Sequence, residues 1–323
     1  MNKDYVVGAD LGGTNIRAAV VDRSGNRIGE GRCPSKAMEG LTVTVGQIAS
    51  AINTAIEDSG VPLQSISGIG MGVPGTIKSH QGIVVWAPNF SNWDNVQIGA
   101  PITEATKLPI VLGNDADVAA FGEYSFGAGK GAHVMVMLTL GTGVGSGLVI
   151  EGRNFLGSSE VAPEMGHQII DPNGPRCGCG RTGCLEAFAG RDPICHRAAR
   201  KAHSGRSTSL LQKSGHDLRY ISPSMIAEAA LEGDPISIET LEEVGFYLGI
   251  GISNIINILN PDKVVIGGGV SQAGDLLFDP IRRTIEVNSI YSAFKACTLV
   301  QAELLDDAGI MGGAALAFQN FGS

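Results

Sequence analysis

A glycine-rich strand–turn–strand pattern occurs twice in this sequence, near its start and near its middle. The apolar run Tyr5–Ala9 leads into the turn DLGGTN and a second apolar run at Ile16–Val21. The uncharged run His133–Leu140 leads into GTGVGSG and the short apolar run Leu148–Ile150. This weak internal repeat predicts two similar α/β lobes, with a turn from each facing one cleft.

The length and composition of the chain fit two lobes with buried cores. Its 323 residues exceed one small domain, and 43% hydrophobic with 17% charged residues favour a packed core over disorder. We predict a small lobe from residues 1–113 plus 303–323. The large lobe is predicted from residues 114–302 and includes a mostly helical region from Asp192 to Asn260.

The charge pattern excludes several classes of protein. The net charge is −9, and no run of Lys and Arg offers a nucleic-acid surface. The uncharged stretches 131–150 and 244–261 are interrupted by glycines or by Ser and Asn, so neither is a convincing membrane span. The apolar run Tyr5–Ala9 is too short for a secretory signal. We therefore expect a cytoplasmic protein, where cysteines stay reduced.

A group of potential metal ligands lies between Glu164 and Arg191. These ligands are His167, Cys177, Cys179 and Cys184. Three thiolates and an imidazole match the tetrahedral preference of zinc, and no open position remains, so we predict a structural zinc site. The C-x-C spacing, followed by four residues and a third cysteine, is tighter than the common C-x2-C spacing. Buried reduced thiols are the alternative.

Three glycine-rich loops follow predicted buried strands and are candidates for binding phosphate. Glycines let backbone N–H groups approach phosphate oxygens, and the Asp10 carboxylate is a suitable oxygen ligand for Mg²⁺. An ordinary hairpin turn is the alternative for each loop alone, but three together favour a nucleotide cleft. The candidate residues are Asp10, Gly12, Gly13, Thr14 and Asn15, then Thr142 and Gly143, and then Gly267, Gly268 and Gly269.

Several amides and carboxylates are candidates for catalysis or sugar binding. Asn114 and Asp115 follow a buried strand and open a helix, so they are either helix N-caps or a general base at the end of a strand. Asn89 lies in a polar loop, where its amide suits sugar hydroxyls or simply forms a turn. Glu164 and Glu186 could accept hydrogen bonds from hydroxyl pairs, with ordinary surface charge as the alternative.

The motifs of this chain resemble those of the ROK family (repressors, open reading frames and sugar kinases), in the order of that family and over nearly the whole length. They are DLGGTN at Asp10, NDAD at Asn114, GTGVGSG at Gly141, EMGH at Glu164, CGCGRTGCLE at Cys177 and GGG at Gly267. The resemblance implies a two-lobe, actin-like (ribonuclease H-like) ATPase fold. It also implies ATP-dependent phosphorylation of a hexose, which we expect at the 6-hydroxyl and with Mg²⁺.

The resemblance also implies roles for individual residues. It makes Asp115 the catalytic base and His167 with the three cysteines a structural zinc site. The residues that it implies for sugar binding are Gly75, Asn89, Asn114, Glu164, His167 and Glu186.

Two features narrow the expected function within the family. Repressor members carry a DNA-binding domain ahead of the sugar lobe, whereas the first strand here starts by Tyr5, so we expect no DNA binding. The loops APN…W, EMGH and LEAFAGR look most like those of glucokinases. Kinases of N-acetylglucosamine, N-acetylmannosamine, allose or fructose share most of these residues, and a non-catalytic sugar sensor is the other alternative. A homodimer is common in the family and is expected here.

Overall fold

The structure is a computed structural model that describes residues 4–87, 90 and 92–322, and it divides into two compact units. The first unit comprises Met1–Gly131, Gly147–Pro163 and Glu303–Ser323. The second comprises Ala132–Ser146 and Glu164–Ala302. This division differs from the predicted lobes, because the helix after residue 114 packs with the C-terminal helix inside the first unit. The division into two lobes that face one cleft stays a prediction.

The first unit holds one five-stranded sheet, a small three-stranded sheet and four α-helices among its described residues. The strands are β1 (Tyr5–Leu11), β2 (Asn15–Asp22), β3 (Arg27–Pro34), β4 (Ile66–Val73), β5 (Thr76–Lys78), β6 (Ile83–Trp86), β7 (Asp94–Gln97), β8 (Ile110–Asn114) and β11 (Arg153–Asn154). The helices are α1 (Leu41–Ser59), α2 (Gly99–Thr106), α3 (Asp115–Phe126) and α11 (Ala308–Phe321).

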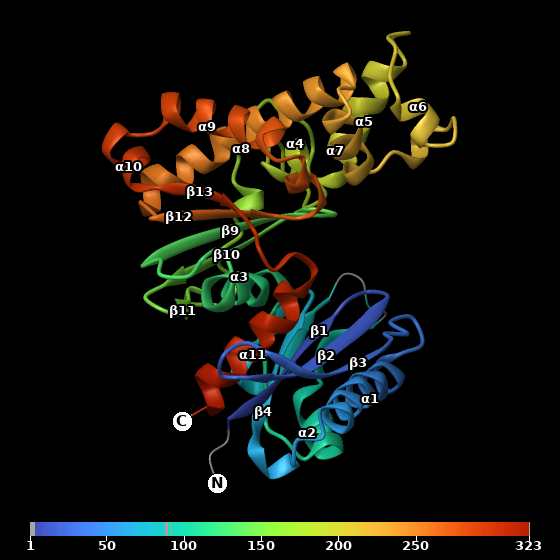
Figure 1. Cartoon of the computed structure of the whole chain (residues 1–323), viewed down its shortest axis with the longest axis vertical. Helices are drawn as coiled ribbons and strands as arrows, with labels where there is room; N and C mark the ends of the chain where they lie inside the picture. Colours follow the sequence, from blue (N-terminus) through green and yellow to red (C-terminus); the bar gives the residue numbers. More distant parts are fainter. Residues whose placement is uncertain (1–3, 88–89, 91, 323) are drawn as a thin grey trace. The chain divides into compact units, whose positions relative to one another are not determined.

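The large sheet of the first unit has the order β3-β2-β1-β4-β8. The β1–β2 and β2–β3 pairs are antiparallel, while β1–β4 and β4–β8 are parallel. The helices α1 and α2 share the main apolar core with one face of this sheet, and α11 packs against its other face (Figure 1). The predicted α1 is confirmed: Val45, Ile48 and Ile52 are buried, and Gly60 ends the helix in the left-handed conformation.

The parallel pairing brings the candidate residues of this unit to one edge of the sheet. Asp10 in β1 is level with Gly72 in β4, and Val73 is level with Asn114 in β8. Because parallel strands end on the same side, the turn after β1 and the start of α3 meet at this edge.

The second unit contains a helical region and most of the other large sheet, whose strand β11 and the end of β10 fall within the residues of the first unit. Its strands are β9 (Val134–Leu140), the start of β10 (Val144–Ile150), β12 (Lys263–Gly267) and β13 (Thr298–Gln301). Its helices are α4 (Glu186–Ala189), α5 (Arg191–Ala202), α6 (Leu210–Lys213), α7 (Pro223–Leu231), α8 (Pro235–Leu259), α9 (Asp275–Asn288) and α10 (Tyr291–Ala296).

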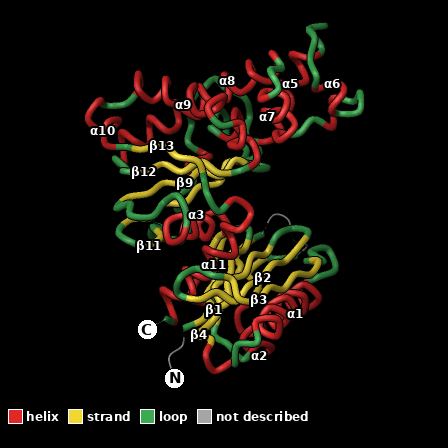
Figure 2. The backbone as a smooth tube through the Cα atoms, in the orientation of Figure 1, coloured by secondary structure: helices red, strands yellow, loops and turns green. Residues whose placement is uncertain are grey.

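The second sheet repeats the strand order of the first, which confirms the predicted internal repeat. Its order is β11-β10-β9-β12-β13, with β10–β11 antiparallel and β9–β12 and β12–β13 parallel. Figure 2 shows β13, β12 and β9 side by side in yellow. The start of β10 corrects one prediction. We expected GTGVGSG to be loop throughout. The strand β10 begins at Val144 instead, so the later glycines of this motif lie within the strand.

The sequence predicts a helix over Pro235–Leu259, with Asp234 as N-cap and Asn260-Pro261 at its end, and α8 has these boundaries. The Asp234 side chain caps it by accepting a hydrogen bond from the Ser237 N–H, and Pro235 occupies the first turn. Asn260 ends the helix in the left-handed conformation, directly before Pro261. The helices α8 and α9 pack side by side, and α5 and α7 also contact α8 (Figure 1). Among the described residues, no helix has the length and apolar composition that a bilayer crossing requires.

Candidate active site

Asn114 caps helix α3 and leaves the carboxylate of Asp115 available for another role. The Asn114 Oδ1 accepts hydrogen bonds from the backbone N–H groups of Ala116, at 2.9 Å, and Asp117, at 3.4 Å. Asp115 is the first helical residue, and its Oδ1 accepts from the Ala116 N–H at 2.9 Å. The cap interpretation that the sequence left open for both residues therefore applies to Asn114.

The surroundings of Asp115 disfavour its charged form. The side chain keeps solvent-accessible surface, but the protein around the carboxyl group desolvates it and raises its pKa above the ordinary aspartate value. The negative charge of Asp10 raises the pKa further, and the hydrogen bond from Ala116 opposes the shift. A carboxylate with a raised pKa is a better proton acceptor than an ordinary aspartate.

Gly75 lies next to Asn114, so the structure brings two of the predicted sugar-binding residues together. The Asn114 Nδ2 donates a hydrogen bond to the Gly75 carbonyl at 2.9 Å. Gly75 has a φ of 103°, and a Cβ at this position would lie 2.0 Å from the Trp86 carbonyl oxygen, so only glycine fits. The predicted sugar ligand Asn89 lies outside the described residues.

The first predicted phosphate loop forms the turn between β1 and β2. The Gly12 N–H donates to the Asn15 carbonyl at 2.9 Å, and Gly13 and Thr14 are exposed at the tip. The Asp10 Oδ2 forms an ion pair with Arg17 at 3.0 Å. The sequence interpretation missed Arg17, although the hairpin register places it directly opposite Asp10, where opposite charges commonly pair.

The other two predicted phosphate loops are neighbours in the second unit. Gly267 at the end of β12 is level with Thr139 near the end of β9, so both loops leave the same edge of the sheet. Within the loop after β9, the Gly141 N–H donates to the Gly143 carbonyl at 3.0 Å. The turn is therefore closed on itself before β10 begins.

Glu186 links the loop after β9 to the cysteine cluster. Its Oε2 accepts a hydrogen bond from the Val144 N–H at 3.1 Å, and a Cβ on Gly143 would lie 2.1 Å from that oxygen. The Cys177 thiol donates to its Oε1 at 3.3 Å. The contact with Val144 could not be predicted from the sequence, because it joins residues 42 positions apart.

His167 lies between the two predicted sugar-binding glutamates. Its Nδ1 is 3.9 Å from the Glu186 Oε1, and its Nε2 is 3.9 Å from the Glu164 Oε2. The short 3-10 helix that carries it, Met165–His167, is attached to β10 by a hydrogen bond of 3.0 Å from the Met165 N–H to the Ser146 Oγ. The second unit thus gathers all three of its predicted sugar-binding residues.

The four predicted zinc ligands also converge. The ligand atoms of His167, Cys177, Cys179 and Cys184 all lie within 4.8 Å of one another. The Cys179 and Cys184 sulfurs are 3.7 Å apart, as are the Cys177 sulfur and the His167 Nδ1. With zinc–sulfur bonds of about 2.3 Å, the corners of a tetrahedral site lie about 3.8 Å apart, so this arrangement fits the ion.

The thiols of the cluster sit in different environments. Cys177 and Cys184 are buried, and Cys179 is exposed. Burial raises the pKa of the Cys177 thiol to about 12. A backbone hydrogen bond from Arg181 lowers the pKa of Cys179 to about 6. Cys179 is thus the thiol that most readily releases its proton to solvent and binds a metal ion as a thiolate.

Comparisons with known proteins identify close relatives along the whole chain. The ROK family model matches residues 6–320. A glucokinase of Halalkalibacterium halodurans is 35% identical over 99% of this chain and 96% of its own length.

Two solved structures are also very similar. A ROK family glucokinase from Streptomyces griseus, in complex with glucose and AMPPNP, has a TM-score of 0.83 and 32% identity, covering 98% of this chain and 100% of its own. A ROK family transcriptional regulator, a homolog of the E. coli MLC protein, has a TM-score of 0.87 and 29% identity. That match covers 98% of this chain and 78% of the regulator.

The family match spans both sheets and every described candidate residue, and the fold agrees with the two-lobe sugar kinase fold of the solved relatives. The protein therefore belongs to the ROK family.

Proposed function

We propose that this protein is a glucokinase, which transfers the γ-phosphoryl group of ATP to the 6-hydroxyl of glucose. The observation that carries the proposal is the geometry at the start of α3, where Asn114 takes the capping role and leaves the desolvated Asp115 carboxylate as a base. Similarity to the Halalkalibacterium and Streptomyces glucokinases over nearly the full length supports the same reaction.

Asp115 accepts the proton of the 6-hydroxyl as that oxygen attacks the γ-phosphorus. Phosphoryl transfer needs mainly alignment and neutralisation of charge, so a single positioned base is enough on the protein side. The raised pKa of Asp115 matches this task, because a carboxylate with a higher pKa accepts a proton more readily.

The remaining predicted residues orient the two substrates. Glu164, His167 and Glu186 hold sugar hydroxyls, together with Asn114 and the Gly75 backbone.

The cysteine cluster and the glycine loops complete the assignment. Zinc held by His167 and the three cysteines cross-links the loop that carries these groups and takes no part in the chemistry. The glycine loops would receive the phosphates, and Asp10 would contribute to a Mg²⁺ site that supplies positive charge there.

A second candidate is a sugar sensor without catalysis. Its support is the TM-score of 0.87 to a transcriptional regulator of the same family. The presence of Asp115 favours the kinase, because a sensor that only binds sugar does not require a base at this position. The homodimer and the cytoplasmic location expected from the sequence stay predictions.

A coupled assay of ADP release with a panel of hexoses tests the proposal. We expect turnover with glucose and a kcat/KM for glucose above those for N-acetylglucosamine, N-acetylmannosamine, allose and fructose. Calorimetric binding of glucose without any ADP release from ATP identifies the sensor instead. A higher kcat/KM for another hexose keeps the kinase and replaces its substrate.

A further inference from the structure

The short helix α4 carries Glu186, but it is too short to fix the direction of that side chain by itself. It spans only Glu186–Ala189, and isolated helices of this length are not stable in water. Its final carbonyl groups also have no partners within the helix. The orientation of Glu186 therefore depends on contacts from outside α4.

The Glu186 carboxylate accepts hydrogen bonds from Val144 and Cys177, and a further contact to α4 comes from an arginine. Arg197 lies in α5, and its Nη1 donates a hydrogen bond to the Phe188 carbonyl of α4 at 3.0 Å. Its Nε pairs with the Glu243 carboxylate of α8 at 2.9 Å. One guanidinium group thus joins the end of α4 to the long helix α8, and its planar fork allows both contacts at once.

We propose that Arg197 is a positioning residue for sugar recognition, which holds α4 so that the Glu186 carboxylate faces the sugar. The inference rests on the proposed function and adds to it a residue that does not itself contact either substrate. Arg197 acts through the Phe188 carbonyl, two residues after Glu186 in the same short helix.

Burial and ring contacts make this bridge specific. The Arg197 side chain is only 11% exposed, so its charge requires a close partner, which Glu243 supplies. Its guanidinium lies 5.4 Å from the centre of the Tyr247 ring. That ring stacks on Phe188 at 4.3 Å. Arg197, Tyr247 and Phe188 therefore form one layered contact between α4, α5 and α8.

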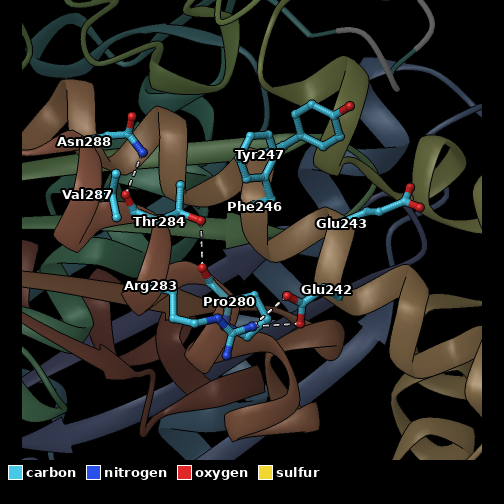
Figure 3. Close-up of a pocket in the computed structure, with 9 residues that line it drawn as sticks. All are labelled: Glu242, Glu243, Phe246, Tyr247, Pro280, Arg283, Thr284, Val287 and Asn288. Atoms are coloured by element: carbon cyan, nitrogen blue, oxygen red, sulfur yellow. Dashed lines mark hydrogen bonds and ion pairs between the residues drawn. The ribbon is translucent and has the colours of Figure 1, made fainter.

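Two partners of Arg197 border a cavity. Glu243 and Tyr247 line a cavity of about 470 Å³ between α8 and α9. Figure 3 shows the Arg283 guanidinium turned toward Glu242 on this wall, while Glu243 points away from that pair. Glu243 is held by its ion pairs with Arg197 and Lys201 of α5.

The test compares Arg197→Met with wild type in glucose binding and in steady-state kinetics. Because Glu186 holds the sugar in the ground state and the transition state alike, the glucose KM and Kd should rise about 10-fold, with kcat changed much less. Arg197→Lys should restore part of the affinity, since an ammonium can reach one partner but has no planar fork.

Lys201 provides the matched control. It lies one turn later in α5 and pairs with the same Glu243 carboxylate at 2.6 Å, but its described ion pairs reach only Glu239 and Glu243 of α8. Lys201→Met should change the glucose KM by less than about twofold. An equal rise in the control, or unchanged glucose affinity in Arg197→Met, overturns the proposal.

Two further outcomes are distinguishable. If wild type neither binds nor phosphorylates any hexose, the proposed function fails, whereas a normal wild type with an unaffected Arg197→Met refutes only the positioning role. Should Arg197→Met not fold, Glu243→Gln replaces it, since it weakens the anchor of Arg197 and leaves the Phe188 contact. We expect about a threefold rise in the glucose KM for Glu243→Gln, and an unchanged KM contradicts the inference.

Discussion

The two units share one sheet order but present their candidate residues in different ways. In the first unit, Asp10, Asn114 and Asp115 lie at the ends of strands or in the first turn of a helix. In the second unit, Glu164, His167 and the cysteines lie in a segment with little regular structure between β11 and α4. The same scaffold therefore supports one set of residues directly and the other through an added loop.

In the first unit, the candidate base is not needed to hold its helix in place. In the second unit, the candidate sugar-binding residues depend on the same contacts that stabilise their loop. Asp115 is held by backbone geometry that does not depend on its charge, because Asn114 supplies the cap. The orientation of His167 depends on its neighbours in the cysteine cluster. Substitution of Asp115 and substitution of a cluster cysteine should therefore have opposite effects on stability, and the following predictions examine that contrast.

The largest expected effect is that of Asp115→Asn on turnover. Loss of the base should lower kcat by at least ~10² while glucose binding stays largely intact. The pKa of Asp115 is raised in the folded protein, so its ionised form costs stability once the pH exceeds the unfolded value. The variant should thus melt at the same temperature as wild type or higher at pH 7. Near-normal kcat contradicts the base assignment, and calorimetry checks the stability.

Cys177→Ser should show the opposite pattern. Removal of one ligand should release the metal, and wild type should contain about one zinc per chain by elemental analysis. We expect a loss of sugar affinity on the order of 10-fold together with a lower melting temperature, because the loop loses its cross-link. Wild-type protein without zinc, or a variant with unchanged glucose affinity, separates the cluster from sugar recognition.

The pH dependence of kcat/KM should report Asp115. The base works only when ionised, so the rate falls as the pH drops through its pKa, and desolvation by the surrounding protein raises that pKa. The acid limb should therefore lie above the ordinary aspartate value of about 3.9. The residual activity of Asp115→Asn should lack this limb. A limb at or below the ordinary value contradicts the desolvated setting of the carboxylate.

The smallest predicted effect concerns the cap of α3. Asn114→Ala removes the acceptor for the N–H groups of Ala116 and Asp117 and the donor to Gly75, and should cost about 1 kcal/mol of unfolding free energy. Ser222→Ala, which removes the cap of α7, is the matched control in the second unit. Both should lower the melting temperature, but only Asn114→Ala should also lower kcat/KM for glucose.

Local sequence patterns predicted some of the regular elements well. The strand Ile66–Val73 and the helix Pro235–Leu259 have the predicted bounds, because apolar periodicity and capping residues act over short distances. The helix Asp275–Asn288 was not predicted, since Pro280 within it reads as a breaker.

Contacts between residues that are far apart in the chain could not be predicted from the sequence. The ion pair of Arg197 with Glu243 and the bond from Val144 to Glu186 join positions that no spacing rule relates. The Cys and His residues of this segment did predict the cluster, because zinc is bound by only a few residue types. Asn89 stays a prediction.

The contact between Glu186 and the turn that contains Gly143 limits how the substrate preference of such a protein can evolve. One oxygen of this carboxylate accepts from Val144, and the other accepts from Cys177. Under the proposed glucokinase function, a substitution that adapts Glu186 to another sugar also disturbs the turn that contains Gly143. Drift toward a new hexose should therefore accumulate at positions around this glutamate, while the glutamate and Gly143 change together or not at all.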